Sequence, residues 1–309
     1  MKSDLISLAD HTPETLLGVL KLAADLKRDW KATAAHRPLV GRTLAMIFEK
    51  PSLRTRVTFE TGIKQLGGAS VYLAPQDIQL GARESVGDIA RNLSRWVDLI
   101  VARTFRHDVL LELARASSVP VINGLSDLLH PCQVLADCQT LQERFGYLEG
   151  LAIAFIGDGN NVVNSWLNAA AAFGFDFRLA CPPGYEPDPQ VLAAARASGR
   201  GRISIVHDPL VAARDADALY TDVWTSMGQE AEAAARRITF ADYQINARLL
   251  AEARAHAIVM HCLPAHRGEE ITAEVLDGPR SVVLEQAENR LHAQKAVMVW
   301  LHGSAVTGS

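Results

Sequence analysis

Several absences narrow the function of this 309-residue chain. Its four cysteines, Cys132, Cys138, Cys181 and Cys262, form no CxxC pair and no Cys/His metal spacing, so no metal site is expected. The formal net charge is only −4, which gives no support for binding nucleic acid or an anionic membrane. The N-terminus lacks an apolar signal segment, and no apolar run reaches the length of a membrane span. We therefore expect a soluble, cytoplasmic protein with reduced thiols.

Short apolar runs alternate with amphipathic segments along the whole chain. Helices are expected at 13–30, 86–97, 109–116 and 134–145, and strands at 43–48, 69–73, 98–102, 119–122, 151–156, 175–181, 202–206, 217–221 and 257–260. This alternation predicts an α/β protein with two parallel-sheet domains. The expected domains are 1–134 and 151–286, with a linking helix at 135–150 and a C-terminal helix, 287–309, that completes the first domain.

The segment Phe48-Glu-Lys-Pro-Ser-Leu-Arg-Thr-Arg56 joins a buried strand to a helix, and Ser52 stands at the N-cap position. Arg54 and Arg56 fall in the first helical turn, where cations oppose the helix dipole. Two arginines at this position are favourable if an anion binds the free N–H groups of the first turn. The alternatives are that both are solvated or that Arg56 pairs with Glu60 at i, i+4.

Polar residues follow five more strands, where the ligands of open α/β sheets bind. The segments are Arg103-Thr104, His130-Pro-Cys-Gln133, Gly157-Asp-Gly-Asn-Asn161, Asp222-Val-Trp-Thr-Ser-Met-Gly228 and His261-Cys-Leu-Pro-Ala265. We expect these segments and the first one to converge on one crevice.

Each of these residues also has a purely structural interpretation. Asn161 could cap the next helix, His130 could be a satisfied loop histidine, Cys262 a small buried filler and Asp222 an N-cap. Gly157-Asp-Gly159 hints at a dinucleotide site, but the third glycine of that fingerprint is missing, which disfavours NAD.

Together these motifs resemble the aspartate/ornithine transcarbamylase family over nearly the full chain. The matching segments are 48–56, 130–133, 155–161, 221–229 and 261–268. One departure stands out, because the family pattern is Ser-Thr-Arg-Thr-Arg and this chain has Leu53 at the second position. That position is understood to act mainly through its backbone N–H, which leucine retains.

The resemblance implies an active site in a cleft between the two domains, with carbamoyl phosphate held by the first. The implied binding residues are Ser52, Leu53, Arg54, Thr55, Gln79, Arg103, His130, Gln133, Cys262, Leu263 and Arg290. In the family the subunits form a trimer, and Gln79 would reach the site of a neighbouring subunit.

The resemblance also implies L-ornithine as the acceptor. Asn161 and the Met227 N–H would take its α-carboxylate, and Asp222 and Ser226 its α-ammonium. Cys262 and the Leu263 carbonyl would lie beside the δ-amine. The expected catalytic residues are Arg54, Arg103, His130, Asp222 and Cys262, with no cofactor.

Other readings remain open from the sequence. They are a carbamoyltransferase for an N-acylated ornithine or putrescine, a non-enzymatic binder of carbamoyl phosphate, and a nicotinamide dehydrogenase. Aspartate as acceptor is disfavoured by Cys132 and Asp222.

Overall fold

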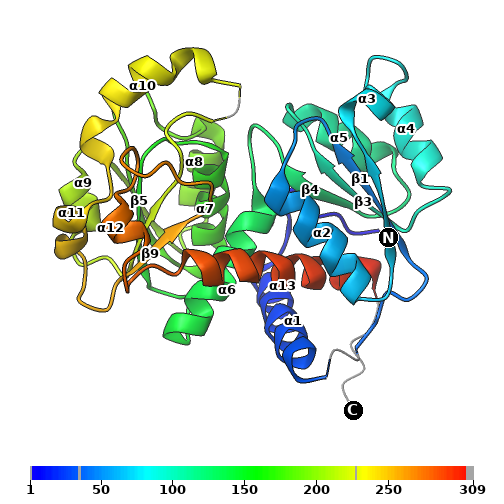
Figure 1. Ribbon diagram of the computed structural model, residues 1–309, viewed down its shortest axis with the longest axis horizontal. Helices are drawn as coiled ribbons and strands as arrows, with labels where there is room; N and C mark the ends of the chain where they lie inside the picture. The colour runs from blue at the N-terminus through cyan, green and yellow to red at the C-terminus, as the bar shows by residue number, and fades with distance from the viewer. Residues whose placement is uncertain (1, 34–35, 227, 304–309) are drawn as a thin grey trace. The chain divides into compact units, whose positions relative to one another are not determined.

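The computed structural model describes residues 2–33, 36–226 and 228–303. The chain divides into two compact α/β units, drawn in Figure 1. Unit 1 comprises residues 1–139 and 288–309, and unit 2 comprises residues 140–287. Helix α6 (Pro131–Phe145) and helix α13 (Val283–His302) each run from one unit into the other. Helix α6 begins three residues before the expected helix 134–145 and ends at the expected residue 145, where Gly146 follows with a φ of 83°. The linking segment that was expected over 135–150 is therefore helical only as far as residue 145.

Unit 1 is built on a four-stranded parallel sheet in the order β2-β1-β3-β4. Its strands are β1 (Thr43–Phe48), β2 (Ala69–Leu73), β3 (Leu99–Arg103) and β4 (Val121–Leu125). The predicted strand 119–122 starts two residues before β4 and ends three residues before it does. Pro120 has no N–H to donate to the ladder, and a turn in which Val119 N–H donates to Ser117 Oγ comes before it.

Four helices of unit 1 begin after a Ser or Thr whose side chain accepts a capping hydrogen bond: η1 (Leu8–Asp10), α1 (Pro13–Ala32), α2 (Leu53–Gln65) and α4 (Val86–Leu93). Helices α3 (Pro75–Ile78) and α5 (His107–Ala116) begin without such a bond. The C-terminal helix α13 lies beside α1 (Figure 1), with Lys31 Nζ 2.7 Å from a Glu288 oxygen. The rings of His11 and Trp300 pack edge to face at 4.8 Å. These contacts return the end of the chain to the first unit.

Unit 2 is built on a five-stranded parallel sheet in the order β7-β6-β5-β8-β9. Its strands are β5 (Ala152–Ile156), β6 (Asp176–Ala180), β7 (Arg202–Val206), β8 (Ala218–Thr221) and β9 (Ile258–His261). Its helices are α7 (Asn161–Phe173), α8 (Pro189–Ala197), α9 (Pro209–Ala213), η2 (Glu230–Glu232), α10 (Ala233–Thr239), η3 (Ala241–Tyr243), α11 (Ala247–Glu252) and α12 (Ala273–Leu276). Strands β5, β8 and β9 are buried along their whole length, which explains why their residues are apolar up to Thr221 and His261 at the ends of β8 and β9.

The strand order of each sheet reverses once, and these reversals position the polar segments. In unit 1 the chain builds outward from β1 to β2 and then from β3 to β4, so the reversal lies between β1 and β3. In unit 2 it lies between β5 and β8. Ligands of open α/β sheets bind beyond the carboxyl ends of the strands at such a point. No helix in the described part of the chain is long and apolar enough to cross a membrane.

Candidate active site

The six polar segments divide equally between the two sheets. Three follow the adjacent strands β1, β3 and β4 of unit 1, and three follow the adjacent strands β5, β8 and β9 of unit 2. Each set therefore gathers at the carboxyl edge of its own sheet, beside the reversal of strand order.

The turn after β1 begins helix α2 as predicted. Ser52 is the N-cap, and its Oγ accepts a hydrogen bond from the Thr55 N–H at 3.2 Å. Leu53 is the first helical residue, and its side chain is 74% exposed, so its contribution to an anion site is its backbone N–H. Arg56 instead pairs with Glu60 at 3.1 Å and stacks on Tyr72 at 3.7 Å, so the structural alternative holds for Arg56.

A group of cations surrounds His130 at this edge of unit 1. The imidazole is buried, and burial lowers its pKa well below 6.5. Four nearby positive charges lower the pKa as well, in decreasing order those of Arg290, Arg103, Arg54 and Lys50. His130 is therefore neutral at physiological pH. Lys50, which the sequence analysis did not assign, is buried as well, and its pKa is lowered by burial and by Arg103. Several positive charges next to a neutral imidazole form an environment that favours a bound anion.

Arg290 joins two other predicted residues within this group. Its guanidinium donates one hydrogen bond to Gln133 Oε1 and another to Thr55 Oγ1 at 3.2 Å. The amide of Gln133 in turn donates to Asp137 Oδ1 at 2.8 Å. Since all four side chains are buried, the guanidinium and the amide are fixed in orientation before any ligand arrives.

Gln79 lies apart from that group on an exposed loop. It ends the short helix α3 in a left-handed conformation, with φ of 44°, and its N–H donates to Pro75 O at 3.0 Å. The two residues before it, Asp77 and Ile78, belong to α3.

Asp222 is the centre of the candidate site in unit 2. Its Oδ2 accepts a hydrogen bond from Asn160 Nδ2 at 2.9 Å, which joins the turns after β5 and β8. Its Oδ1 accepts from the Cys262 thiol at 2.9 Å and from the Val223 N–H at 2.8 Å. The carboxylate is therefore held from three sides, including the turn after β9. Cys262 is half-buried and hydrogen-bonded to Asp222, so it is not the fully buried filler considered as its structural alternative.

The cap of helix α7 corrects one alternative from the sequence. Asn160, and not Asn161, is the N-cap, because its Oδ1 accepts from the N–H groups of Val162 and Val163. Asn161 is the first helical residue and is half-buried. Asn160 thus serves both the helix and Asp222, a role the sequence analysis missed although an Asn before an apolar helix is a cap signal.

A buried ion pair supports the same turn. Arg236 Nη2 donates to Asp158 Oδ2 at 2.8 Å, and the exposed fractions of these two residues are 3% and 9%. Burial raises the pKa of Asp158 to about 6, against the lowering effect of Arg236. Neither residue was predicted from the sequence.

The turn after β9 is fixed by a buried histidine. His261 Nδ1 accepts from the Leu263 N–H at 2.9 Å, so its proton lies on Nε2, which donates to Glu270 Oε1 at 3.0 Å. Leu263 has a φ of 58°, which few non-glycine residues adopt. The bond to His261 holds this conformation and with it the direction of the Leu263 carbonyl.

The remaining predicted residues lie on the segment after Asp222. Ser226 is half-buried, and its N–H donates to Gln229 Oε1 at 3.1 Å. Met227 lies outside the described residues. A cavity of about 520 Å³ is lined by residues that include Leu263, Leu276, Ser281 and Val283 but not Asn161 or Asp222. Asp222, His261 and Cys262 also place three potential metal donors within 4.8 Å of one another.

Comparisons with known proteins agree on one family. Residues 3–143 match the model "Aspartate/ornithine carbamoyltransferase, carbamoyl-P binding domain", and residues 149–301 match the "Asp/Orn binding domain" of the same family. The chain is 54% identical to the ornithine carbamoyltransferase of Methanoculleus marisnigri over 301 residues, which is 97% of both chains.

Solved structures give the same result. The ornithine carbamoyltransferase from Pyrococcus furiosus superposes with a TM-score of 0.95 at 50% identity, covering 98% of each chain. The anabolic ornithine carbamoyltransferase from Campylobacter jejuni superposes with a TM-score of 0.92 at 39% identity, covering 99% of this chain and all of the other.

Proposed function

The chain belongs to the aspartate/ornithine carbamoyltransferase family, and we propose that it transfers the carbamoyl group of carbamoyl phosphate to the δ-amine of L-ornithine. The products are L-citrulline and phosphate, and the reaction serves arginine biosynthesis. The observation that carries this proposal is the cationic group of Arg54, Arg103 and Arg290 around the neutral His130.

The donor is assigned to unit 1. Its phosphate binds the first turn of α2, through the N–H groups that follow the Ser52 cap, the hydroxyls of Ser52 and Thr55, and the guanidinium of Arg54. Arg103 bridges the phosphate and the carbonyl oxygen. A neutral imidazole can donate to that oxygen without adding repulsion among the arginines, which is the role of His130.

The carbamoyl NH₂ is assigned to Gln133. Its Oε1 already accepts from Arg290, so the same oxygen can accept from the NH₂ while Arg290 faces the carbonyl.

The chemistry is acyl transfer from a mixed anhydride. The lone pair of the neutral δ-amine attacks the carbonyl carbon and forms a C–N bond, and the π electron pair of the C=O bond moves onto the carbonyl oxygen. The C–O bond to phosphate then breaks, phosphate leaves with its electron pair, and the amine nitrogen loses a proton. Negative charge thus appears first on the carbonyl oxygen and then on the phosphate, where fixed guanidinium and N–H donors lower its energy.

The acceptor is assigned to unit 2. Asp222 and Ser226 take the α-ammonium, while Asn161 and the Met227 N–H take the α-carboxylate. The support for this assignment is that the Asp222 carboxylate is already oriented by Asn160, Cys262 and the Val223 N–H and, of its four lone-pair sites, keeps one for a cation. Cys262 and the Leu263 carbonyl then lie beside the δ-amine.

The proposal includes a homotrimer in the cytoplasm whose subunits share active sites. The exposed Gln79 loop supports it, since a residue that serves a neighbouring site has to be presented at the surface. In a cyclic trimer each subunit would give this loop to the next.

A side-by-side assay tests the function. Purified enzyme is supplied with carbamoyl phosphate and either ornithine, N-acetylornithine, putrescine or aspartate, and the carbamoylated product and phosphate are both measured. We expect kcat/KM to be highest for ornithine by at least a factor of about 10². A higher value for another amine would reassign the acceptor, and phosphate release without any carbamoylated product would contradict transferase activity.

A further inference from the structure

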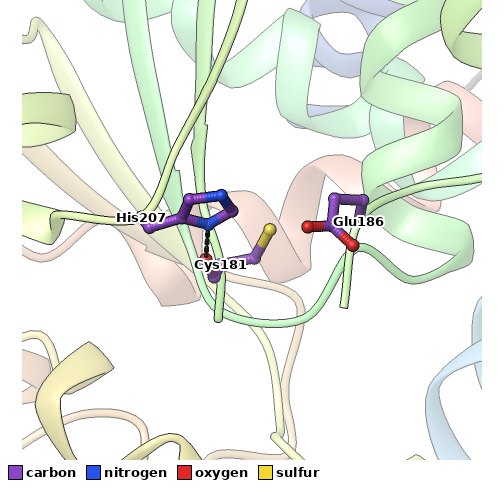
Figure 2. A group of neighbouring side chains, drawn as sticks. All are labelled: Cys181, Glu186 and His207. Atoms are coloured by element: carbon purple, nitrogen blue, oxygen red, sulfur yellow. Dashed lines mark hydrogen bonds between the residues drawn. The ribbon is translucent and has the colours of Figure 1, made fainter. Parts of the chain in front are cut away.

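A second cluster of reactive side chains lies at the carboxyl edge of the unit 2 sheet, on strands away from Asp222. Cys181 directly follows β6, His207 directly follows β7, and Glu186 lies on the loop between β6 and α8. One potential donor atom from each lies within 4.8 Å of the other two. Figure 2 shows the Cys181 sulfur between the His207 ring and the Glu186 carboxylate.

The sheet fixes two of these residues. Ala180 and Val206 are paired in the ladder between β6 and β7, and the Cys181 N–H donates to Val206 O at 3.2 Å. The hydroxyl of Tyr243 donates to the His207 carbonyl at 2.8 Å. The backbones that carry the sulfur and the imidazole are thus held at a constant separation.

The hydrogen bond of the imidazole prepares it to act as a ligand. His207 Nδ1 lies 2.8 Å from the Cys181 carbonyl oxygen, which can only accept, so Nδ1 carries the proton and Nε2 carries a free lone pair. A histidine that binds a metal through one nitrogen commonly donates the other N–H to a carbonyl in this way.

The third donor is adjustable. Glu186 is exposed, and its Oε2 accepts from the Gly184 N–H at 3.0 Å, which leaves Oε1 to point elsewhere. In a tetrahedral zinc site, donors about 2.0–2.3 Å from the ion lie roughly 3.5 Å from one another. Rotation of the exposed Glu186 side chain can shorten its distances to the other two donors toward that value, while the His207 hydrogen bond to the Cys181 carbonyl is kept.

The chemistry of the donors selects the ion. One sulfur, one imidazole nitrogen and one carboxylate oxygen suit Zn²⁺, whereas Mg²⁺ and Ca²⁺ require several oxygen ligands. The nearby carboxylates of Glu186 and Asp158 would attract a cation. Burial of the Cys181 thiol and, after it, the charges of these two groups together raise the pKa of the thiol to about 12.

We propose that Cys181, Glu186 and His207 bind one Zn²⁺ ion, with water as the fourth ligand. Forming the zinc–sulfur bond releases the thiol proton to solvent, and no change of oxidation state is involved. This site is separate from Asp222 and from the residues assigned to the two substrates.

The bound ion would link the loop that carries Glu186 to the ends of β6 and β7. That loop packs against the turn after β5, where the Gly159 N–H donates to Tyr185 O at 2.9 Å. The fit is so close that a Cβ added at Gly159 would lie 2.5 Å from the Glu186 carbonyl carbon. Fixing Glu186 to β6 and β7 would therefore stabilise this packing, and bound zinc should raise the melting temperature.

Cobalt provides a spectroscopic test that does not depend on activity. The metal-free full-length protein is titrated with Co²⁺ in a Cys262→Ser background, which removes the thiol of the other cluster, Asp222, His261 and Cys262. We expect a thiolate-to-cobalt charge-transfer band that saturates at one equivalent and disappears on addition of Zn²⁺. Competition with a chromophoric chelator then gives the zinc affinity.

Substitution of each proposed ligand identifies the side chains that bind the metal. Cys181→Ser should abolish the charge-transfer band, while His207→Gln and Glu186→Gln should each weaken zinc binding by about tenfold or more and remove the zinc-dependent rise in melting temperature. The last two side chains are exposed, so these variants test the site even if Cys181→Ser does not fold. His266→Gln, in a cluster without a thiol, is the matched control and should bind as the parent does. A band that persists in Cys181→Ser, or no band in the parent, would overturn the proposal.

Discussion

The thiol of Cys262 donates a hydrogen bond to Asp222 Oδ1 at 2.9 Å, although the two residues are 40 positions apart in the chain. The contact forms because β8 and β9 are neighbours and Thr221 is paired with His261. Asp222 and Cys262 are the residues that follow this pair, so they lie side by side at the edge of the sheet. Asn160 reaches the other oxygen of the same carboxylate from β5. The groups that position Asp222 are uncharged donors, so the negative charge of its carboxylate remains available to a cationic ligand.

The first prediction concerns that charge. Asp222→Asn should raise KM for ornithine by roughly 10²-fold, because a buried carboxylate that pairs with an ammonium is replaced by a neutral amide. KM for carbamoyl phosphate should change by less than about threefold. Initial-rate measurements with each substrate varied in turn give both values. Equal damage to both would mean that Asp222 only supports the fold.

The second prediction separates Arg54 from Arg56, two arginines in the first turn of α2. Arg54→Ala should lower kcat/KM for carbamoyl phosphate by roughly 10²-fold or more, as for loss of one preorganised donor. Arg56→Ala is the matched control, since Arg56 pairs with Glu60 and stacks on Tyr72, and it should stay within about threefold of the parent. If the two variants were equally impaired, the anion would not be bound by Arg54 in particular.

The third prediction concerns the protonation of His130. Because its pKa in the folded protein lies well below 6.5, its ring resonances in NMR should not shift between pH 6 and 9. The unfolded chain binds a proton there near pH 6.5, so the free energy of unfolding should fall as the pH drops below that value. His130→Asn should make this fall shallower.

The same site predicts the pH dependence of the rate. kcat/KM for ornithine should rise from pH 6 to above 8, because the attacking amine must be neutral and a free alkylammonium has a pKa of about 10.4. The rise should persist in His130→Asn at a lower overall rate, since it belongs to the substrate. A rise that vanished in this variant would identify His130 as the titrating group instead.

Another prediction distinguishes Asn160 from Asn161. Asn160→Ala removes both cap bonds and should cost about 1 kcal/mol of stability, whereas Asn160→Ser keeps a cap oxygen and should cost much less. Both should raise KM for ornithine, because both lose the amide donor to Asp222. Asn161→Ala should raise this KM without a change in melting temperature. Greater destabilisation by Asn161→Ala would reverse the two roles.

The sequence predicted those features that depend on neighbouring residues. Strand β1 begins and ends at the predicted residues because a short apolar run meets a Pro-Ser turn, and Ser52 caps α2 because serine precedes the helical pattern. Two consecutive asparagines were ambiguous, since either could cap α7, and the wrong one was considered. The bond between Arg290 and Gln133 joins residues 157 positions apart, so no local pattern could indicate it. Cys181 and His207 meet only because β6 and β7 pair, which hides their relation from any spacing rule.

The last prediction concerns the sharing of active sites between subunits. Gln79 lies on an exposed loop, and we propose that it reaches the carbamoyl phosphate site of the next subunit. Gln79→Ala and Arg54→Ala proteins should each be impaired alone. When the two are mixed, dissociated and reassembled, some hybrid trimers would contain one site with both residues intact, and activity should exceed the sum of the two parents. Gln76→Ala, on the exposed surface of the preceding helix α3, is the control and should behave as the parent does in the same mixing experiment. Native mass spectrometry would verify that hybrids have formed. If verified hybrids never exceed that sum, or if the active protein is a monomer, Gln79 acts within its own subunit or not at all.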